Sequence, residues 1–137
     1  MKKAITKLGR TEWALMRICW KKGRSSARTI HEESLKNYKR TYNTVKTILD
    51  RLVKKHYLKR EKFGPIWLYS PVMNEKNTLS KAINDFTRTV LDGSILPFFM
   101  NVLKKKKHRA ELKEVKNMLD SLFNEENQSP AGPTEQE

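Results

Sequence analysis

The chain has 137 residues and carries 29 Lys and Arg against 15 Asp and Glu, a net charge of +14. Its 37% of hydrophobic residues exclude a wholly disordered protein, while one cysteine and three histidines exclude an internal disulfide and disfavour a zinc site. No apolar run approaches the ~20 residues of a membrane-spanning helix and no secretion signal follows the first lysines, so we expect a soluble cytoplasmic protein without a cofactor.

The first two helices are expected from amphipathic spacing and from turn residues. A helical pattern covers residues 8–20. Thr11 is its expected N-cap, and Gly23 stands where a left-handed residue ends a helix. A second helix is expected over residues 26–37, with Ser26 as its N-cap. Its expected buried positions are Ala27, Ile30 and Leu35.

The third pattern, residues 41–58, divides most clearly into an apolar and a polar side. Thr41 is its expected N-cap. The apolar stripe comprises Tyr42, Val45, Ile48, Leu49, Leu52 and Val53. The polar side comprises Asn43, Thr44, Lys46, Thr47, Asp50, Arg51 and Lys54. Such a helix can pack on a core with one side and offer the other side to a partner.

Two strand-like runs follow this helix, Leu58–Phe63 and Ile66–Ser70. Residues 64–65 are Gly-Pro, a pair typical of a hairpin turn, and Pro71 closes the unit. Three helices followed by a two-stranded hairpin are the element order of a winged helix-turn-helix. We therefore expect a DNA-binding domain of this architecture over residues 1–73.

The rest of the chain is expected to be helical except at its end. Three helices are predicted, over residues 74–91, 95–103 and 109–123. Asn74 and Ser94 are the expected N-caps of the first two, and Asp92-Gly93 ends the first. The lysines at 104–107 are expected in an exposed turn. Ser, Pro, Gly, Gln and Glu dominate residues 124–137, which predicts a disordered tail.

The apolar faces of these last helices need something to cover them. Three short helices bury little on their own, so packing against a second copy of the chain is the economical solution. The alternative is that they fold back on the N-terminal half. We predict a helical dimerisation domain over residues 74–123, and the fold class is mostly α with a small β-hairpin. The expected dimerisation residues are Leu79, Ile83, Phe86, Val90, Phe99, Leu112, Val115 and Leu119.

The positive charge lies entirely in the N-terminal half. Residues 1–73 contain 19 Lys and Arg and 5 Asp and Glu, a net charge of +14, whereas residues 74–137 contain 10 of each. This asymmetry is typical of a module that binds a polyanion, joined to an electrically neutral module.

The third helix has the residue types that read DNA. Asn pairs with an adenine edge, Lys with guanine or phosphate, and the methyl group of Thr contacts the methyl group of thymine. The alternative is that these side chains are ordinary solvated positions. Those predicted to face the DNA on this helix are Thr41, Asn43, Thr44, Lys46, Thr47 and Arg51.

Catalysis finds no support in the sequence. His31-Glu32 begins like the helix of a zinc protease, but Leu35 stands where the second histidine is required. No phosphate-binding glycine loop is present, and Cys19 lies on the apolar side of the first helix as an expected core residue. We therefore expect that the protein is not an enzyme.

Three segments together resemble the penicillinase-repressor family of bacterial regulators. They are E-W-x-x-M-x-x-x-W at residues 12–20, T-V-K-T-x-L-x-R-L at residues 44–52, and L-Y-S-P at residues 68–71. The resemblance covers residues 8–122. It implies a homodimeric repressor that binds dyad-symmetric operators in double-stranded DNA. It also implies control by a membrane-embedded zinc-metalloprotease sensor, with cleavage after an asparagine in the short apolar helix, which corresponds to Asn101-Val102 here.

The chain departs from the family pattern at several positions. His56 occupies a turn where relatives usually have glycine, which costs ~1 kcal/mol if its φ is positive. Pro65 stands at the wing tip in place of an arginine, so Lys62 or Lys59 would make the wing's phosphate contact, and we include Lys62 in the DNA-binding set. The C-terminus lacks the cysteines of the copper-responsive branch. A second hypothesis is a nucleic-acid-binding module for RNA or DNA without a regulatory role.

Overall fold

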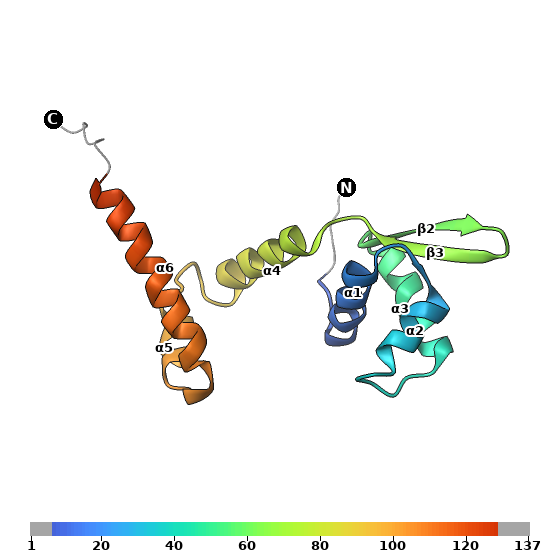
Figure 1. The fold of residues 1–137 in the computed structure, drawn as a ribbon, viewed down its shortest axis with the longest axis horizontal. Coiled ribbons are helices and arrows are strands. Elements are labelled where there is room, and N and C mark those ends of the chain that lie inside the picture. The colour runs from blue at the N-terminus through green and yellow to red at the C-terminus, as the bar shows by residue number, and fades with distance from the viewer. Residues whose placement is uncertain (1–6, 129–137) are drawn as a thin grey trace. The chain divides into compact units, whose positions relative to one another are not determined.

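The computed structural model of this chain describes residues 7–128 and divides the chain into two compact units, residues 1–85 and 86–137 (Figure 1). Most of the described residues are helical, and one small sheet completes the first unit. The expected class, mostly α with a small β element, is confirmed. The predicted tail beyond residue 128 lies outside the described residues.

The first unit is a winged helix-turn-helix. Its elements are α1 (Arg10–Lys22), β1 (Ser25–Ser26), α2 (Ala27–Ser34), α3 (Tyr42–Lys54), β2 (Leu58–Phe63), β3 (Ile66–Pro71) and the beginning of α4 (Glu75–Thr89). Strands β2 and β3 form the expected antiparallel hairpin, in register from Leu58 opposite Pro71 to Phe63 opposite Ile66. We call this hairpin the wing.

The sheet has a third strand that the sequence did not predict. Strand β1 pairs antiparallel with β3, with Ser25 opposite Tyr69 and Ser26 opposite Leu68, so the sheet order is β1-β3-β2. Two consecutive serines show no alternation of apolar and polar residues. Their strand conformation comes from pairing with β3, a tertiary effect that local sequence does not encode.

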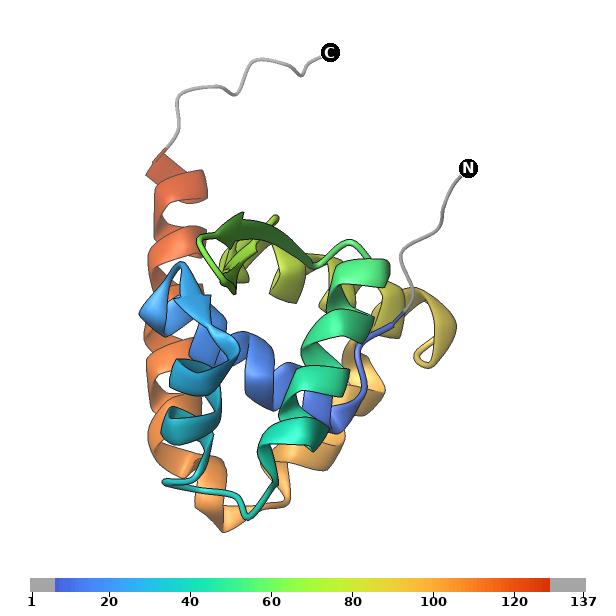
Figure 2. The same cartoon turned by 90° about the vertical axis from the view of Figure 1, so that its right-hand side faces the viewer.

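The core lies where α1, α2 and α3 contact one another and the base of the wing (Figure 2). Its buried side chains include four residues of the predicted stripe of α3 and the predicted core residue Cys19, and Val53 of that stripe packs half-buried against them. The members of this core are Leu15, Met16, Cys19, Ala27, Ile30, Val45, Ile48, Leu49, Leu52, Tyr57, Leu58 and Tyr69. Tyr42, which was also expected in the stripe, is exposed and packs edge-on against the ring of His31.

The predicted beginning of the first helix was wrong. Helix α1 has Gly9 as its N-cap, and Thr11 lies within the first turn. The Oε1 atom of Glu12 accepts a hydrogen bond from the Gly9 N–H at 2.7 Å, so a side chain three residues ahead satisfies the helix start. The helix then continues to Lys22, and Gly23 follows with the expected positive φ, 75°.

The predicted extent of the second helix was also wrong. Ser26 caps α2 as expected, because its Oγ accepts from the Thr29 N–H at 3.2 Å. The helix ends at Ser34 rather than at residue 37, and Leu35 is 50% exposed instead of buried. Ser34 takes a buried position and donates its hydroxyl to the His31 carbonyl at 2.7 Å, which satisfies the polar group locally.

The chain leaves the wing through residues that belong to the first unit. The Trp20 indole N–H donates a hydrogen bond to the Met73 carbonyl at 2.9 Å. Asn74 caps α4 as expected by accepting from the Asn77 N–H at 2.7 Å, and Thr78 is buried. The beginning of α4 therefore lies within the compact unit of residues 1–85.

The second unit contains the end of α4, then α5 (Leu96–Leu103), a 3-10 turn at Lys106–His108 (η1) and α6 (Arg109–Gln128). Asp92 and Gly93 have positive φ after α4, as expected for a helix end. Helix α6 continues five residues beyond its predicted end at residue 123, so the tail does not begin at residue 124. Glu125, Glu126 and Gln128, which have good helix propensity, favour this extension.

Candidate nucleic-acid interface

Helix α3 begins at a capping residue that is also predicted to face DNA. The Thr41 Oγ1 accepts a hydrogen bond from the Thr44 N–H at 3.1 Å and donates to the Thr44 Oγ1 at 2.9 Å. This pairing fixes the first turn of the helix. The polar residues of that turn are therefore held on one exposed surface.

Three uncharged polar side chains of α3, those of Asn43, Thr44 and Thr47, lie on this exposed surface. They line a shallow recess together with Thr11 of α1 and Arg51 of α3. The Thr47 hydroxyl donates to the Asn43 carbonyl at 2.9 Å, which leaves its methyl group available for apolar contact. A recess with amide, hydroxyl, methyl and guanidinium groups has the chemistry of base-edge recognition.

The side chain of Arg51 is oriented by Glu12, a residue of α1. Its Nε donates to Glu12 Oε2 at 2.9 Å, and the Lys55 Nζ donates to Glu12 Oε1 at 2.8 Å. Burial raises the pKa of Glu12, but the hydrogen bonds from Gly9, Lys55 and Arg51 outweigh burial and lower it overall. A buried, ionised carboxylate on α1 therefore sets the direction of a cation on α3, the helix predicted to face DNA.

Lys46 does not face the recess that holds Arg51. It lines a second recess, between α2, α3 and the wing, whose other residues are Ser26, Ala27, Arg28, Tyr42, Pro65, Ile66, Trp67 and Tyr69. The Lys46 Nζ contacts Asp50 at 3.0 Å and the Tyr69 hydroxyl at 3.1 Å. The predicted set is therefore divided: four of its residues line the first recess, Lys46 lines the second, and Thr41 and Lys62 line neither.

The wing presents cations stacked on one aromatic ring. The Lys62 Nζ lies 5.3 Å from the ring centroid of Trp67, and the Arg60 guanidinium lies 4.6 Å from it. Phe63 and Ile66 are exposed on either side of the turn at Gly64, whose φ is +61°. Lys62 is thus exposed on the wing, as its predicted role requires.

Several residues that shape this surface were absent from the predicted site. Glu12 orients Arg51, and Asp50 and Tyr69 contact Lys46. Arg60 acts through Asp50, to which it donates a hydrogen bond. Only one of them left a local signal, because Asp50 follows Lys46 by four residues, the spacing of a helical ion pair. The others come from distant segments.

The residues that resemble the start of a zinc-protease helix, His31 and those after it, make other contacts in the structure. The His31 Nε2 lies 2.7 Å from the Arg40 carbonyl oxygen, and a carbonyl only accepts, so Nε2 carries the proton. Glu33 pairs with Lys21, Lys22 and Lys36. Within residues 7–128, no group of three metal-ligating side chains could hold an ion.

The predicted dimerisation residues line surfaces rather than a closed core. Leu79, Ile83, Phe86, Val90 and Leu119 are exposed, and Phe99, Leu112 and Val115 are half-buried. An apolar groove between α5 and α6 is lined by Phe99, Leu103, Arg109, Ala110, Leu112, Lys113, Val115, Lys116 and Leu119.

The predicted cleavage point lies within α5. Asn101, before this point, is exposed, and Val102, after it, is half-buried.

Comparison with known proteins decides the family. The sequence model described as Penicillinase repressor matches residues 8–121, most of the chain. The chain belongs to the penicillinase repressor family. Its members are transcriptional repressors rather than enzymes, in agreement with the absence of a catalytic motif.

Individual family members resemble the chain over most of their length. The methicillin resistance regulatory protein MecI of Mammaliicoccus sciuri is 29% identical over 110 residues, which cover 80% of this chain and 89% of MecI. A penicillinase repressor of Staphylococcus aureus is also 29% identical, over 81% of this chain and 89% of its own. The solution structure of the DNA binding domain of the repressor BlaI matches with a TM-score of 0.50 and 28% identity.

The BlaI match covers 56% of this chain and 93% of that domain. The match supports the assignment of the winged helix as the DNA-binding part of this repressor family member. Among the helices of residues 7–128, none is both long and apolar enough to cross a membrane.

Proposed function

We propose that this chain is a transcriptional repressor that binds a palindromic operator as a homodimer and is released by a sensor-triggered signal. The observation that carries the proposal is the exposed polar surface of α3, placed on a half of the chain with a net charge of +14. Phosphate contacts supply affinity, and base contacts in the major groove supply specificity.

Each DNA-facing residue has a distinct role in this proposal. Asn43 and Thr44 read base edges from the N-terminal end of α3, and the methyl group of Thr47 contacts a thymine methyl. Thr41, Lys46 and Arg51 contact phosphates beside them. Lys62 places the wing against the neighbouring backbone or minor groove.

The C-terminal helices join two copies of the chain. The exposed apolar residues on α4, α5 and α6 are too many to remain in water on an isolated protomer. Pairing would cover them and place two α3 helices on successive major grooves of one operator. The dimer acts in the cytoplasm, where the operator lies.

Release is proposed to follow a cut between Asn101 and Val102 by a membrane-embedded zinc-metalloprotease sensor. The bond lies inside α5, so a cut would separate α4 from α6. The dimer would lose part of its apolar interface. Two half-site contacts would then no longer be linked, and a loss of ~10²–10⁴ in affinity follows.

Selection of bound duplexes from a random pool with the full chain tests this function. A repressor enriches a palindrome whose half-site centres lie about one or two helical turns apart. Asn43→Ala and Thr44→Ala should relax the selected sequence, whereas Asn84→Ala, an equally exposed asparagine on α4, should leave it unchanged. A pool without enrichment would instead identify a nucleic-acid-binding module without sequence preference.

A further inference from the structure

The carboxylate of Asp50 lies where α3 meets the wing. Its Oδ1 accepts hydrogen bonds from the Tyr69 hydroxyl at 2.6 Å and from the Arg60 Nη1 at 3.0 Å. Its Oδ2 accepts from the Lys46 Nζ at 3.0 Å. One carboxylate on α3 is therefore shared by a lysine of the same helix, an arginine of β2 and a tyrosine of β3.

Asp50 carries a full negative charge in this arrangement. Partial burial raises its pKa, but hydrogen bonds from Tyr69 and Lys46, with the charges of Lys46 and Arg60, outweigh burial and lower it. The pKa of Lys46 is raised by its hydrogen bonds with Tyr69 and Asp50. The group is thus two cations around one anion.

The two cations are accessible to a phosphate. The Lys46 side chain is 32% exposed and the Arg60 side chain 37%. Lys46 lines the recess that also holds Arg28, and Arg60 stacks on Trp67 at the edge of that recess. In the free protein both cations pair with the single carboxylate of Asp50, so each gives up an existing ion pair when it binds a phosphate.

We propose that Asp50 restricts sequence-independent binding to DNA by holding Lys46 and Arg60 in ion pairs. This inference rests on the proposed function. A half-chain with a net charge of +14 binds any duplex through counterion release, and a genome offers ~10⁶–10⁹ competing sites. A carboxylate beside the contact surface lowers this general affinity without touching the residues that read bases.

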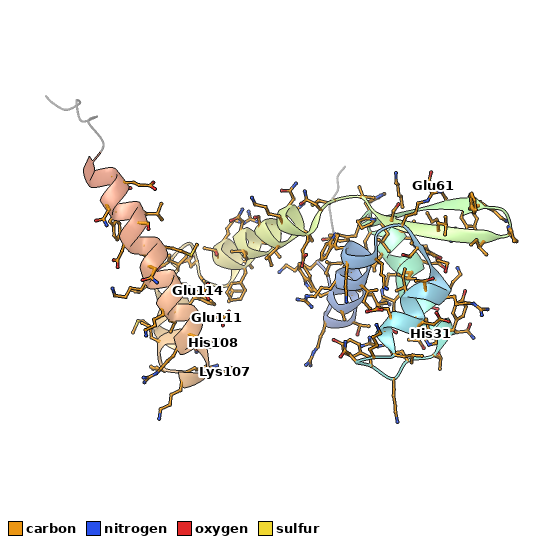
Figure 3. All side chains as sticks on the ribbon, in the orientation of Figure 1. His31, Glu61, Lys107, His108, Glu111 and Glu114 are labelled. Atoms are coloured by element: carbon orange, nitrogen blue, oxygen red, sulfur yellow. The ribbon has the colours of Figure 1, made fainter. Side chains whose placement is uncertain are left out.

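Asp50→Asn tests the inference, because it removes the charge and keeps an oxygen acceptor for Tyr69. Glu61→Gln is the matched control: Glu61 lies on β2, next to Arg60 in sequence (Figure 3), and makes no ion pair with any residue that the structure describes. Both variants raise the net charge by one. Binding of each full-length protein to one unrelated duplex is measured by fluorescence anisotropy over a range of salt concentrations.

The inference expects Asp50→Asn to bind the unrelated duplex more tightly than wild type and to depend more steeply on salt. Each newly available phosphate contact adds ~0.9 to the slope of log affinity against log salt concentration, so the slope steepens by up to ~1.8 per protomer. Glu61→Gln should change the slope by less. Equal slopes for the two variants, or weaker binding by Asp50→Asn, would overturn the inference.

Arg60→Gln provides a second test should Asp50→Asn fail to fold, as checked by thermal melting. With Asp50 in place, loss of the paired Arg60 should leave the slope close to that of wild type, and a decrease of ~0.9 would contradict the inference. A wild-type protein without a preferred duplex refutes the proposed function. In that case the salt slopes of Asp50→Asn and Glu61→Gln on an unrelated duplex still test the role of Asp50.

Discussion

The Nε of Arg51 donates a hydrogen bond to the Oε2 of Glu12 at 2.9 Å, which ties α3 to α1. Glu12 is 3% exposed and also accepts from the Gly9 N–H and from Lys55. It therefore caps α1, orients a cation that we propose to contact DNA, and offsets positive charge within a strongly basic unit.

Glu12→Gln is expected to lower the free energy of unfolding by about 1–3 kcal/mol, because charged hydrogen bonds at a buried site become neutral ones. Urea unfolding checks this value. Glu32→Gln is the control, since Glu32 is exposed on α2 and should change stability by less than about 0.5 kcal/mol. An equal effect of the two changes would contradict the role of Glu12.

The same contact predicts a pH dependence. The folded-state pKa of Glu12 is lowered, so its contribution is fully present above the unfolded value of about 4.3 and is lost as pH falls through the folded value. The stability difference between wild type and Glu12→Gln should therefore shrink below about pH 4.3. A difference that is constant from pH 7 to pH 3 would show that the charge of Glu12 contributes nothing.

The sequence predicted the elements with local signals. Ser26, Thr41 and Asn74 cap the helices for which they were expected. The stripe of α3 is buried except for Tyr42, which is exposed, and Val53, which is half-buried. Periodicity and capping act between near neighbours, so one sequence contains them. The exposed polar surface of α3 was predictable for the same reason.

What the sequence did not predict depends on distant contacts. Strand β1 exists because Ser25 pairs with Tyr69, and Arg51 is oriented by a carboxylate 39 residues earlier. Lys46 was assigned to the same surface as Arg51, although it faces the wing through Tyr69. No spacing within a helix reveals a partner supplied by another element.

His56 is a second position where a substitution should change stability. Its φ is 69°, in the left-handed region, where a side chain costs about 1 kcal/mol relative to glycine. His56→Gly is therefore expected to raise the midpoint of urea unfolding. Lys54→Gly, at an exposed position within α3, should lower the midpoint, by a free energy of about 1 kcal/mol. Destabilisation by both changes would show that the backbone at His56 is not strained.

Operator binding should depend strongly on salt. A dimer that neutralises roughly 6–10 phosphates loses ~10³–10⁵ in affinity between ~50 and ~200 mM salt. Arg51→Ala should weaken binding to operator and to unrelated DNA alike, whereas Asn43→Ala should mainly reduce the preference for the operator. Anisotropy titrations on both duplexes separate the two effects. Binding that is insensitive to salt would contradict the placement of the interface.

Dimerisation through the C-terminal helices can be tested at Leu119, which lines the groove between α5 and α6 and is 45% exposed. Leu119→Asp places a charge in the expected apolar interface and should convert the dimer to a monomer at tens of micromolar in sedimentation equilibrium. Asn117→Asp adds the same charge two residues away, at an exposed position of α6. A wild-type chain that is monomeric under these conditions would contradict the dimer.

Cleavage is tested by expressing the chain together with its sensor, inducing the cells and mapping the fragments by mass spectrometry. The expected products end at Asn101 and begin at Val102, and uninduced cells provide the control. An intact chain during full derepression would show release by another route.

Cys19 is the single sulfhydryl of the chain and is fully buried in the core of the first unit. Burial raises the pKa of its thiol to about 12, so the reactive thiolate is scarce at neutral pH. A disulfide reagent added to the native protein will therefore modify Cys19 only when that core opens. Where opening and closing are faster than modification, the modification rate gives the opening equilibrium of the winged helix in the full-length protein, without any introduced probe. Operator binding stabilises the folded winged helix and should slow this reaction, so the modification rate of Cys19 reports how much of the protein is bound to DNA.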